Sequence, residues 1–152
     1  MKRVALIRPN DFIVGSMSAL IARLGLEPVR PPDVNSLQTL ALDDLIGAVV
    51  STAVSSPMPL TFPDAAWALR QRSEVPMIAT TMMRDPAASV AFVAGELKGK
   101  PGDFTVFSSA PDTNTARLIG SPKGLLVLRF EEIQSAAAPV LDLVSRHFHL
   151  AP

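Results

Sequence analysis

Short, continuous apolar runs alternate along this chain with segments whose apolar residues recur at helical spacing. Such runs are typical of strands that are buried on both faces of a parallel sheet. Strands that alternate with helices imply parallel pairing, because each helix returns the chain to the start of the next strand. The sequence therefore predicts an α/β protein with a doubly wound parallel sheet of five to six strands and helices on both faces. The expected strands span residues 4–7, 26–30, 45–53, 75–80, 104–108 and 125–130.

Residues that commonly cap helix N-termini stand at the start of the segments between these strands. Asp11 stands before the first helical pattern, and either Asp33 or Asn35 can cap the second. Pro139 should either kink the last helix or mark its true start, because proline cannot continue a helix from within. The expected helices span residues 11–24, 33–42, 64–72, 85–97, 112–119 and 131–148.

The composition fits one folded domain over residues 1–152. Hydrophobic residues make up 48% of the chain and charged residues 18%, so the chain can bury a core. The 14 basic side chains balance 14 acidic ones, which gives no electrostatic reason to expect nucleic acid or an anionic membrane as a partner. The chain has no cysteine and no apolar run long enough to span a bilayer, so we expect a cytoplasmic protein.

Three stretches carry a resemblance to a known family. Residues 4–25 combine a strand, a turn and a helix; residues 44–50 read DLIGAVV, and residues 75–81 read VPMIATT. Pro57-Met58-Pro59 follows the second of these strands. Together they resemble the receiver domain of bacterial two-component response regulators, over residues 1–98 and again over 124–150. The resemblance implies a flavodoxin-like fold and a role in signal transduction.

The residues that carry the family's chemistry are replaced in this chain. Receivers hold Mg²⁺ with an acidic pair after the first strand, where this chain has Arg8-Pro9. The position of the phospho-accepting aspartate falls near Ser51 or Thr52, whereas Thr80 or Thr81 keeps the hydroxyl after the fourth strand. Because phosphoryl transfer needs metal, acceptor and cation together, we expect a receiver-like domain that is not phosphorylated and that uses no metal or cofactor.

The last strand and the chain before it also depart from the family. The position of the family's lysine falls on Leu128 or Arg129, and the usual proline is absent. The connection that precedes this strand is much longer than an ordinary helix-to-strand connection. We therefore expect an atypical insertion at about residues 101–124, which can hold an added strand and a short helix.

The first functional hypothesis is a signalling or scaffolding module that binds a protein partner or a second copy of itself. Receiver-like domains commonly dock partners through the fourth helix, the last strand and the last helix. By position, the candidate interface residues are Met82, Met83, Phe92, Leu128, Arg129 and Phe130.

The alternative is a small ligand-binding domain or enzyme that uses the crevice at the carboxyl ends of the strands. Arg8 can bind an anion beside a helix N-terminus, or it can be exposed or ion-paired with Asp44 or Asp85. The hydroxyl groups of serine and threonine at the strand ends either line the crevice or form hydrogen bonds with backbone groups in turns. No catalytic residue is identified, and the candidate ligand-binding residues are Arg8, Asn10, Asp11, Ser51, Thr52, Thr80 and Thr81.

His147 and His149 form an H-x-H pair near the end of the chain. On a helix, residues i and i+2 point apart, so we expect no shared metal ion. A positive charge near a helix C-terminus is sufficient to explain a histidine at this place.

Overall fold

The computed structural model describes residues 1–53, 56, 58–99, 104–110, 113 and 115–150. It contains one sheet of six strands, all parallel, in the order β2-β1-β3-β4-β6-β5. The predicted α/β class and flavodoxin-like doubly wound arrangement are thus confirmed. The strands are β1 (Arg3–Ile7), β2 (Glu27–Val29), β3 (Leu45–Ser51), β4 (Met77–Thr81), β5 (Thr105–Ser108) and β6 (Gly124–Arg129).

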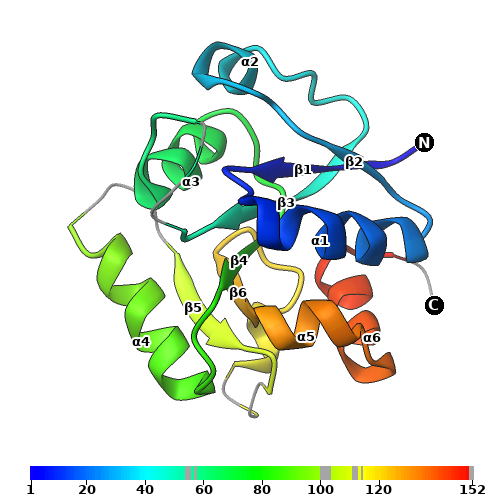
Figure 1. Ribbon diagram of the computed structural model, residues 1–152, viewed down its shortest axis with the longest axis vertical. Helices are drawn as coiled ribbons and strands as arrows, with labels where there is room; N and C mark the ends of the chain where they lie inside the picture. The colour runs from blue at the N-terminus through cyan, green and yellow to red at the C-terminus, as the bar shows by residue number, and fades with distance from the viewer. Residues whose placement is uncertain (54–55, 57, 100–103, 111–112, 114, 151–152) are drawn as a thin grey trace.

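Helices cover both faces of the sheet and build a separate apolar core on each (Figure 1). On one face, α2 (Val34–Gln38), α3 (Phe62–Arg70) and α4 (Pro86–Leu97) pack against one set of strand side chains. On the other face, α1 (Asp11–Arg23), α5 (Phe130–Ser135) and α6 (Ala138–His147) pack against the alternate set. The central strands read as continuous apolar runs because both of their faces are buried.

Polar side chains before the helices accept hydrogen bonds from free N–H groups of the first turn. Asn10 caps α1, so the prediction that Asp11 is the cap was wrong; Asp11 is the first residue of the helix. Of the two candidates for α2, the cap is Asp33, and this helix is shorter than expected. Asp85 caps α4 by accepting from the N–H of Ala88.

The expected insertion contains an added edge strand. Strand β5 pairs with β6 in parallel, so β6 lies between β4 and β5. The short helix expected over 112–119 is only a 3-10 turn at Ala116–Leu118. Residues 101–103, 111–112 and 114 of the predicted insertion lie outside the described residues.

The single helix predicted over residues 131–148 is two helices, α5 and α6. Ala136 has a left-handed backbone with φ 46°, which ends α5. Pro139 is the second residue of α6, so it marks the true start of a helix, as one of the two alternatives stated. Over the described residues, no helix combines the length and apolarity that crossing a membrane requires.

His147 is a buried, neutral residue, which corrects the expectation of a positive charge at the helix end. The backbone N–H of Gly120 donates to its Nδ1 at 2.9 Å, and its Nε2 lies 2.8 Å from the carbonyl oxygen of Met77. An accepting Nδ1 places the proton on Nε2, which therefore donates to Met77. Burial lowers the pKa of His147 to about 4, although the hydrogen bond to Met77 opposes this shift. The imidazole thus joins α6 to β4 and to the loop before β6.

Candidate functional site

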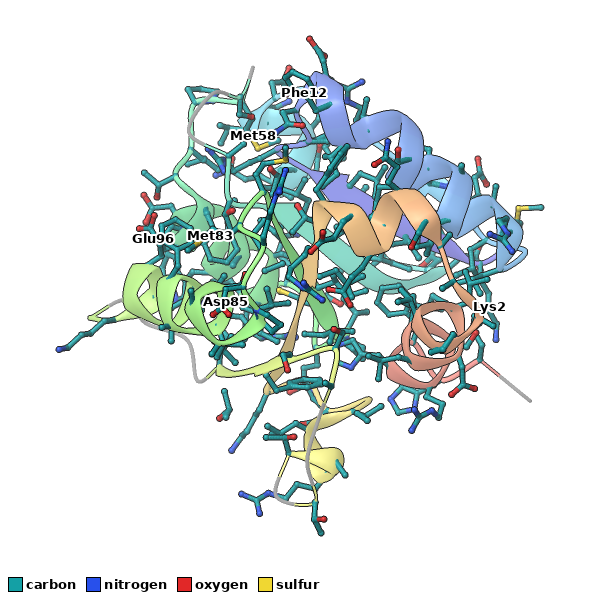
Figure 2. All side chains as sticks on the ribbon, turned by 60° about the horizontal axis from the view of Figure 1, so that its bottom comes forward. Lys2, Phe12, Met58, Met83, Asp85 and Glu96 are labelled. Carbon is teal, nitrogen blue, oxygen red and sulfur yellow. The ribbon has the colours of Figure 1, made fainter. Side chains whose placement is uncertain are left out.

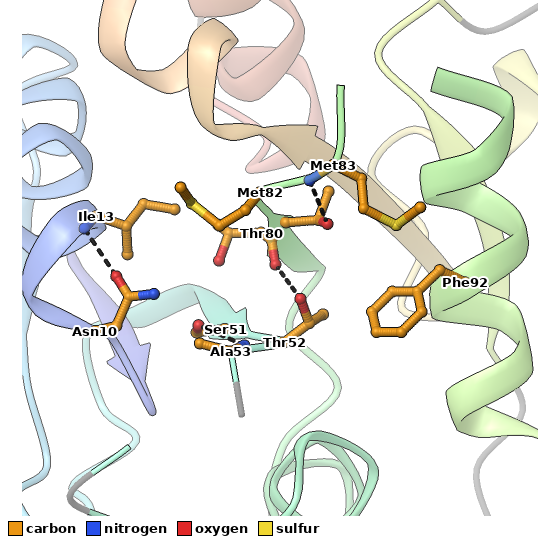
Figure 3. Close-up of a pocket in the computed structure, with 10 residues that line it drawn as sticks. Asn10, Ile13, Ser51, Thr52, Ala53, Thr80, Met82, Met83 and Phe92 are labelled. Carbon is orange, nitrogen blue, oxygen red and sulfur yellow. Dashed lines mark hydrogen bonds between the residues drawn. The ribbon is translucent and has the colours of Figure 1, made fainter. Parts of the chain in front are cut away.

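A pocket of about 190 Å³ lies at the carboxyl ends of the central strands (Figure 3). The chain leaves β1 towards β2 on one side, while β3 and β4 lie on the other side of β1. This reversal of strand order opens a crevice at the carboxyl edge, where ligands of open α/β sheets bind. The pocket is lined by Asn10, Ile13, Ser51, Thr52, Ala53, Thr80, Thr81, Met82, Met83 and Phe92.

Hydroxyl and amide groups form the polar part of this pocket. Thr52 donates from Oγ1 to the carbonyl oxygen of Thr80 at 2.8 Å. Ser51 and Thr81 each accept from a backbone N–H two residues later in the chain, at 3.1 Å in both cases. Asn10 accepts from the N–H of Ile13 through Oδ1, which leaves its amide N–H groups available. The hydroxyl oxygens of Ser51 and Thr81 thus accept from backbone N–H groups in turns, which is one of the two alternatives given for these residues.

Thr80 differs from the other hydroxyl residues of the pocket. It is 2% exposed, and among the described residues its hydroxyl has no hydrogen-bond partner. Figure 3 shows its side chain in the middle of the lining residues, between Asn10 and Thr52. A buried hydroxyl without a partner is unfavourable by roughly 1–3 kcal/mol, so such groups are uncommon in folded proteins and require an explanation.

Apolar side chains form the mouth of the pocket. Met82 is 52% exposed, and Met83 and Phe92 are each 38% exposed. Met82 and Met83 directly follow β4, and Phe92 lies on α4. In Figure 2, Met83 lies beside α4, on the side of the molecule away from Lys2, which precedes β1. The pocket therefore combines a polar interior with an exposed apolar rim.

Arg8 directly follows β1, close to the turn that carries Asn10, but it does not line this pocket. It is buried, and its backbone is left-handed with φ 58°. Its guanidinium donates to the carbonyl oxygens of Ser51 at 2.6 Å, Ala53 at 2.8 Å and Leu60 at 2.5 Å. Burial lowers the pKa of Arg8, and the negative charge of Glu96 opposes that shift.

This contact, which we call the Arg8 clamp, differs from the expected exposed or ion-paired arginine. Its described partners are backbone carbonyls at the end of β3 and in the chain between β3 and α3, and neither Asp44 nor Asp85 is among them. Arg8 also lines a second hollow of about 260 Å³ with Arg30 and Met58. Anion binding by Arg8 stays a prediction, and this hollow is where the structure would allow it.

The remaining predicted residues divide into surface and interior positions. Asp11 is exposed and lies outside the pocket lining. Leu128 is fully buried, so it cannot meet a partner, and we exclude it from the interface set. Arg129 is half-buried and pairs with Glu131 and Glu132, while Phe130 is half-buried in the core against α1.

Ile13 and Ala53 also line the pocket, although neither was among the candidate residues predicted from the sequence. Ile13 belongs to the buried face of α1, and Ala53 is the last residue of the strand expected over residues 45–53. Because alanine and isoleucine carry no chemical signal of ligand binding, only the position next to the turns that end β1 and β3 could have pointed to them.

The described residues that line the pocket include no carboxylate, imidazole, amine or guanidinium. Over the described residues, no three histidine, aspartate or glutamate side chains gather where they could hold a metal ion. The described lining can therefore offer hydrogen bonds and apolar contacts, but it includes no strong general base and no charged ligand for a hard cation. Comparison with protein families and with curated proteins found no match to this chain.

Proposed function

We propose that this protein is a receiver-like signalling or scaffolding module that lacks the phosphorylation switch and acts by binding a protein partner. The Arg8 clamp is the observation that carries the proposal. It stands at the end of β1, where the resemblance to receivers places the acidic pair that holds Mg²⁺. A buried guanidinium repels a divalent cation and provides no oxygen ligand.

The Arg8 clamp also supports a static conformation at this edge. Its three hydrogen bonds connect the end of β1 to the end of β3 and to the chain between β3 and α3, across 43 to 52 positions of sequence. Charge-assisted hydrogen bonds of this kind are stronger than neutral ones. Such a module would present one fixed surface, whereas a phosphorylated receiver alternates between two.

Exposed apolar side chains supply the proposed interaction surface. Met82, Met83 and Phe92 lie together at the pocket mouth, and flexible methionine side chains adapt well to a partner's surface. We take a second copy of this chain as the first partner to test, because receiver-like domains commonly dimerise through this region.

Sedimentation velocity over a range of protein concentrations tests the proposal. We expect a concentration-dependent dimer that is lost in the double variant Met82→Ser/Phe92→Ser and is unchanged by Mg²⁺ with acetyl phosphate. Phe12→Ser is the control, because Phe12 is also an exposed apolar residue but lies outside the pocket lining. Dimerisation that requires acetyl phosphate would contradict the loss of the switch, and a monomer under all conditions would exclude self-association.

A further inference from the structure

We infer that the pocket at the carboxyl ends of β1, β3 and β4 binds a small uncharged ligand: one ring that carries a hydrogen-bond acceptor. The unpartnered hydroxyl of Thr80 points to this ligand. The inference does not depend on protein binding, so it stands if the self-association experiment fails.

The size of the pocket limits the ligand to about one ring. A cavity of about 150 Å³ lined by apolar side chains binds benzene, and this pocket of about 190 Å³ has room for a ring and one small substituent. Ile13, Met82, Met83 and Phe92 provide the apolar and aromatic contacts that a ring requires. A larger ligand would have to extend past the exposed rim.

The polar groups of the pocket are mainly donors, so the ligand's substituent should be an acceptor. The hydroxyl oxygens of Ser51 and Thr81 already accept from backbone N–H groups, which leaves their O–H groups to donate. The amide of Asn10 has its oxygen engaged with Ile13 and its N–H groups left to donate. The Thr80 hydroxyl can donate or accept and has no competing partner among the described residues.

The charge of the lining argues against an ionised ligand. Among the described residues that line the pocket, none carries a charge, and the nearby cation Arg8, which does not line the pocket, already donates to three backbone carbonyls. A carboxylate taken from water into this pocket would lose its hydration without gaining an ion pair. An amide or ketone oxygen meets the same donors at a much smaller desolvation cost.

A small void beside the pocket provides the competing explanation for Thr80. The void has a volume of about 10 Å³ and is lined by Ser51, Thr80 and apolar side chains that include Leu6 and Met17. This volume is at the lower limit for one water molecule, which needs two to four polar partners. With mostly apolar walls, the void is a poorer partner for the hydroxyl than a ligand in the pocket.

Titration of ¹⁵N-labelled protein with benzamide and benzoate, followed by amide NMR, tests the inference. The two probes have the same ring and size and differ in charge. We expect saturable shifts at lining residues with benzamide, with a dissociation constant on the order of 1 mM for so small a ligand, and weaker binding of benzoate. No saturable shift with benzamide, or tighter binding of benzoate, would overturn the inference.

A pair of Thr→Val variants tests the role of Thr80. Thr80→Val keeps the shape of the side chain and removes the hydroxyl, so we expect benzamide affinity to fall about 2-fold to 10-fold with no loss of folding stability. Thr105→Val on the edge strand β5, whose Thr105 is exposed, is the matched control and should leave the affinity unchanged. Unchanged affinity in Thr80→Val, together with reduced stability, would assign the hydroxyl to a buried water instead.

Discussion

At the scale of single residues, Arg8 and Arg70 both stabilise loops of the fold by donating several guanidinium hydrogen bonds to backbone carbonyls. Arg8 joins β1 to the chain after β3, and Arg70 donates to the carbonyl oxygens of Ser73, Val75 and Pro122. Burial lowers the pKa of Arg70 as it does that of Arg8. A planar guanidinium with five N–H groups can reach several carbonyls at once, which a lysine ammonium on a flexible stem does poorly.

Arg8→Lys should therefore destabilise the protein by about 2–4 kcal/mol, because it keeps the charge but leaves buried carbonyls unpaired. The free energy of unfolding in urea measures this effect. Arg146→Lys is the control, since Arg146 forms an exposed ion pair with Asp142 and should change stability by less than about 0.5 kcal/mol. Equal effects of the two substitutions would contradict a structural role for the Arg8 clamp.

His147 should make the folding stability depend on pH. Its pKa is about 4 in the folded state and about 6.5 when unfolded, so between these values the unfolded chain binds more protons. Its contribution is complete above about pH 6.5 and is lost as the pH falls towards 4, by about 3 kcal/mol at most. His147→Gln should flatten the curve of unfolding free energy against pH in this window; parallel curves for the two proteins would show that another group is responsible.

At the scale of elements, the periodicity of apolar residues predicted the order of strands and helices because that signal is local. The strand bounds differ from the expected ones by a few residues at most, for example Glu27–Val29 against 26–30. Pro139 indicated a kink or a helix start within residues 131–148, but the end of a separate helix α5 was not predicted because Ala136, unlike glycine, gives no sign of a left-handed stop. The added strand was expected from the length of the insertion, but its place at the sheet edge depends on pairing that the local pattern does not contain.

The packing of α6 on the sheet depends on the absence of a side chain at Gly47 of β3. A Cβ atom there would come within 2.3 Å of the ring of Phe148, which is buried. Gly47→Ala should destabilise the protein by about 1–3 kcal/mol through overpacking. Thermal or urea unfolding measures the change.

The same substitution in a Phe148→Leu background should be much less harmful, because the smaller side chain leaves room for the methyl group. Gly15→Ala in α1 is the control, since a Cβ atom at Gly15 meets nothing within 4 Å and alanine favours a helix by about 0.5–1 kcal/mol. Additive effects of Gly47→Ala and Phe148→Leu would contradict direct packing between these residues.

At the scale of the whole molecule, the strand order brings residues from three distant parts of the sequence to one pocket. The sequence predicted that seven residues lie near one edge, because the carboxyl ends of parallel strands lie together. Five of them line the pocket, namely Asn10, Ser51, Thr52, Thr80 and Thr81, whereas Arg8 and Asp11 do not. The burial of Arg8 and the unpartnered hydroxyl of Thr80 depend on contacts that no sequence pattern records.

We propose that this edge is a fixed, uncharged binding site and not a metal-dependent phosphorylation site. Titration of ¹⁵N-labelled protein with Mg²⁺, followed by acetyl phosphate, tests this claim by amide NMR. We expect no saturable shift at residues 8–13, 51–53 and 80–83, because the described residues that line the pocket include no carboxylate and Arg8 holds its edge. Saturable shifts of these amides with Mg²⁺, enlarged by acetyl phosphate, would contradict it.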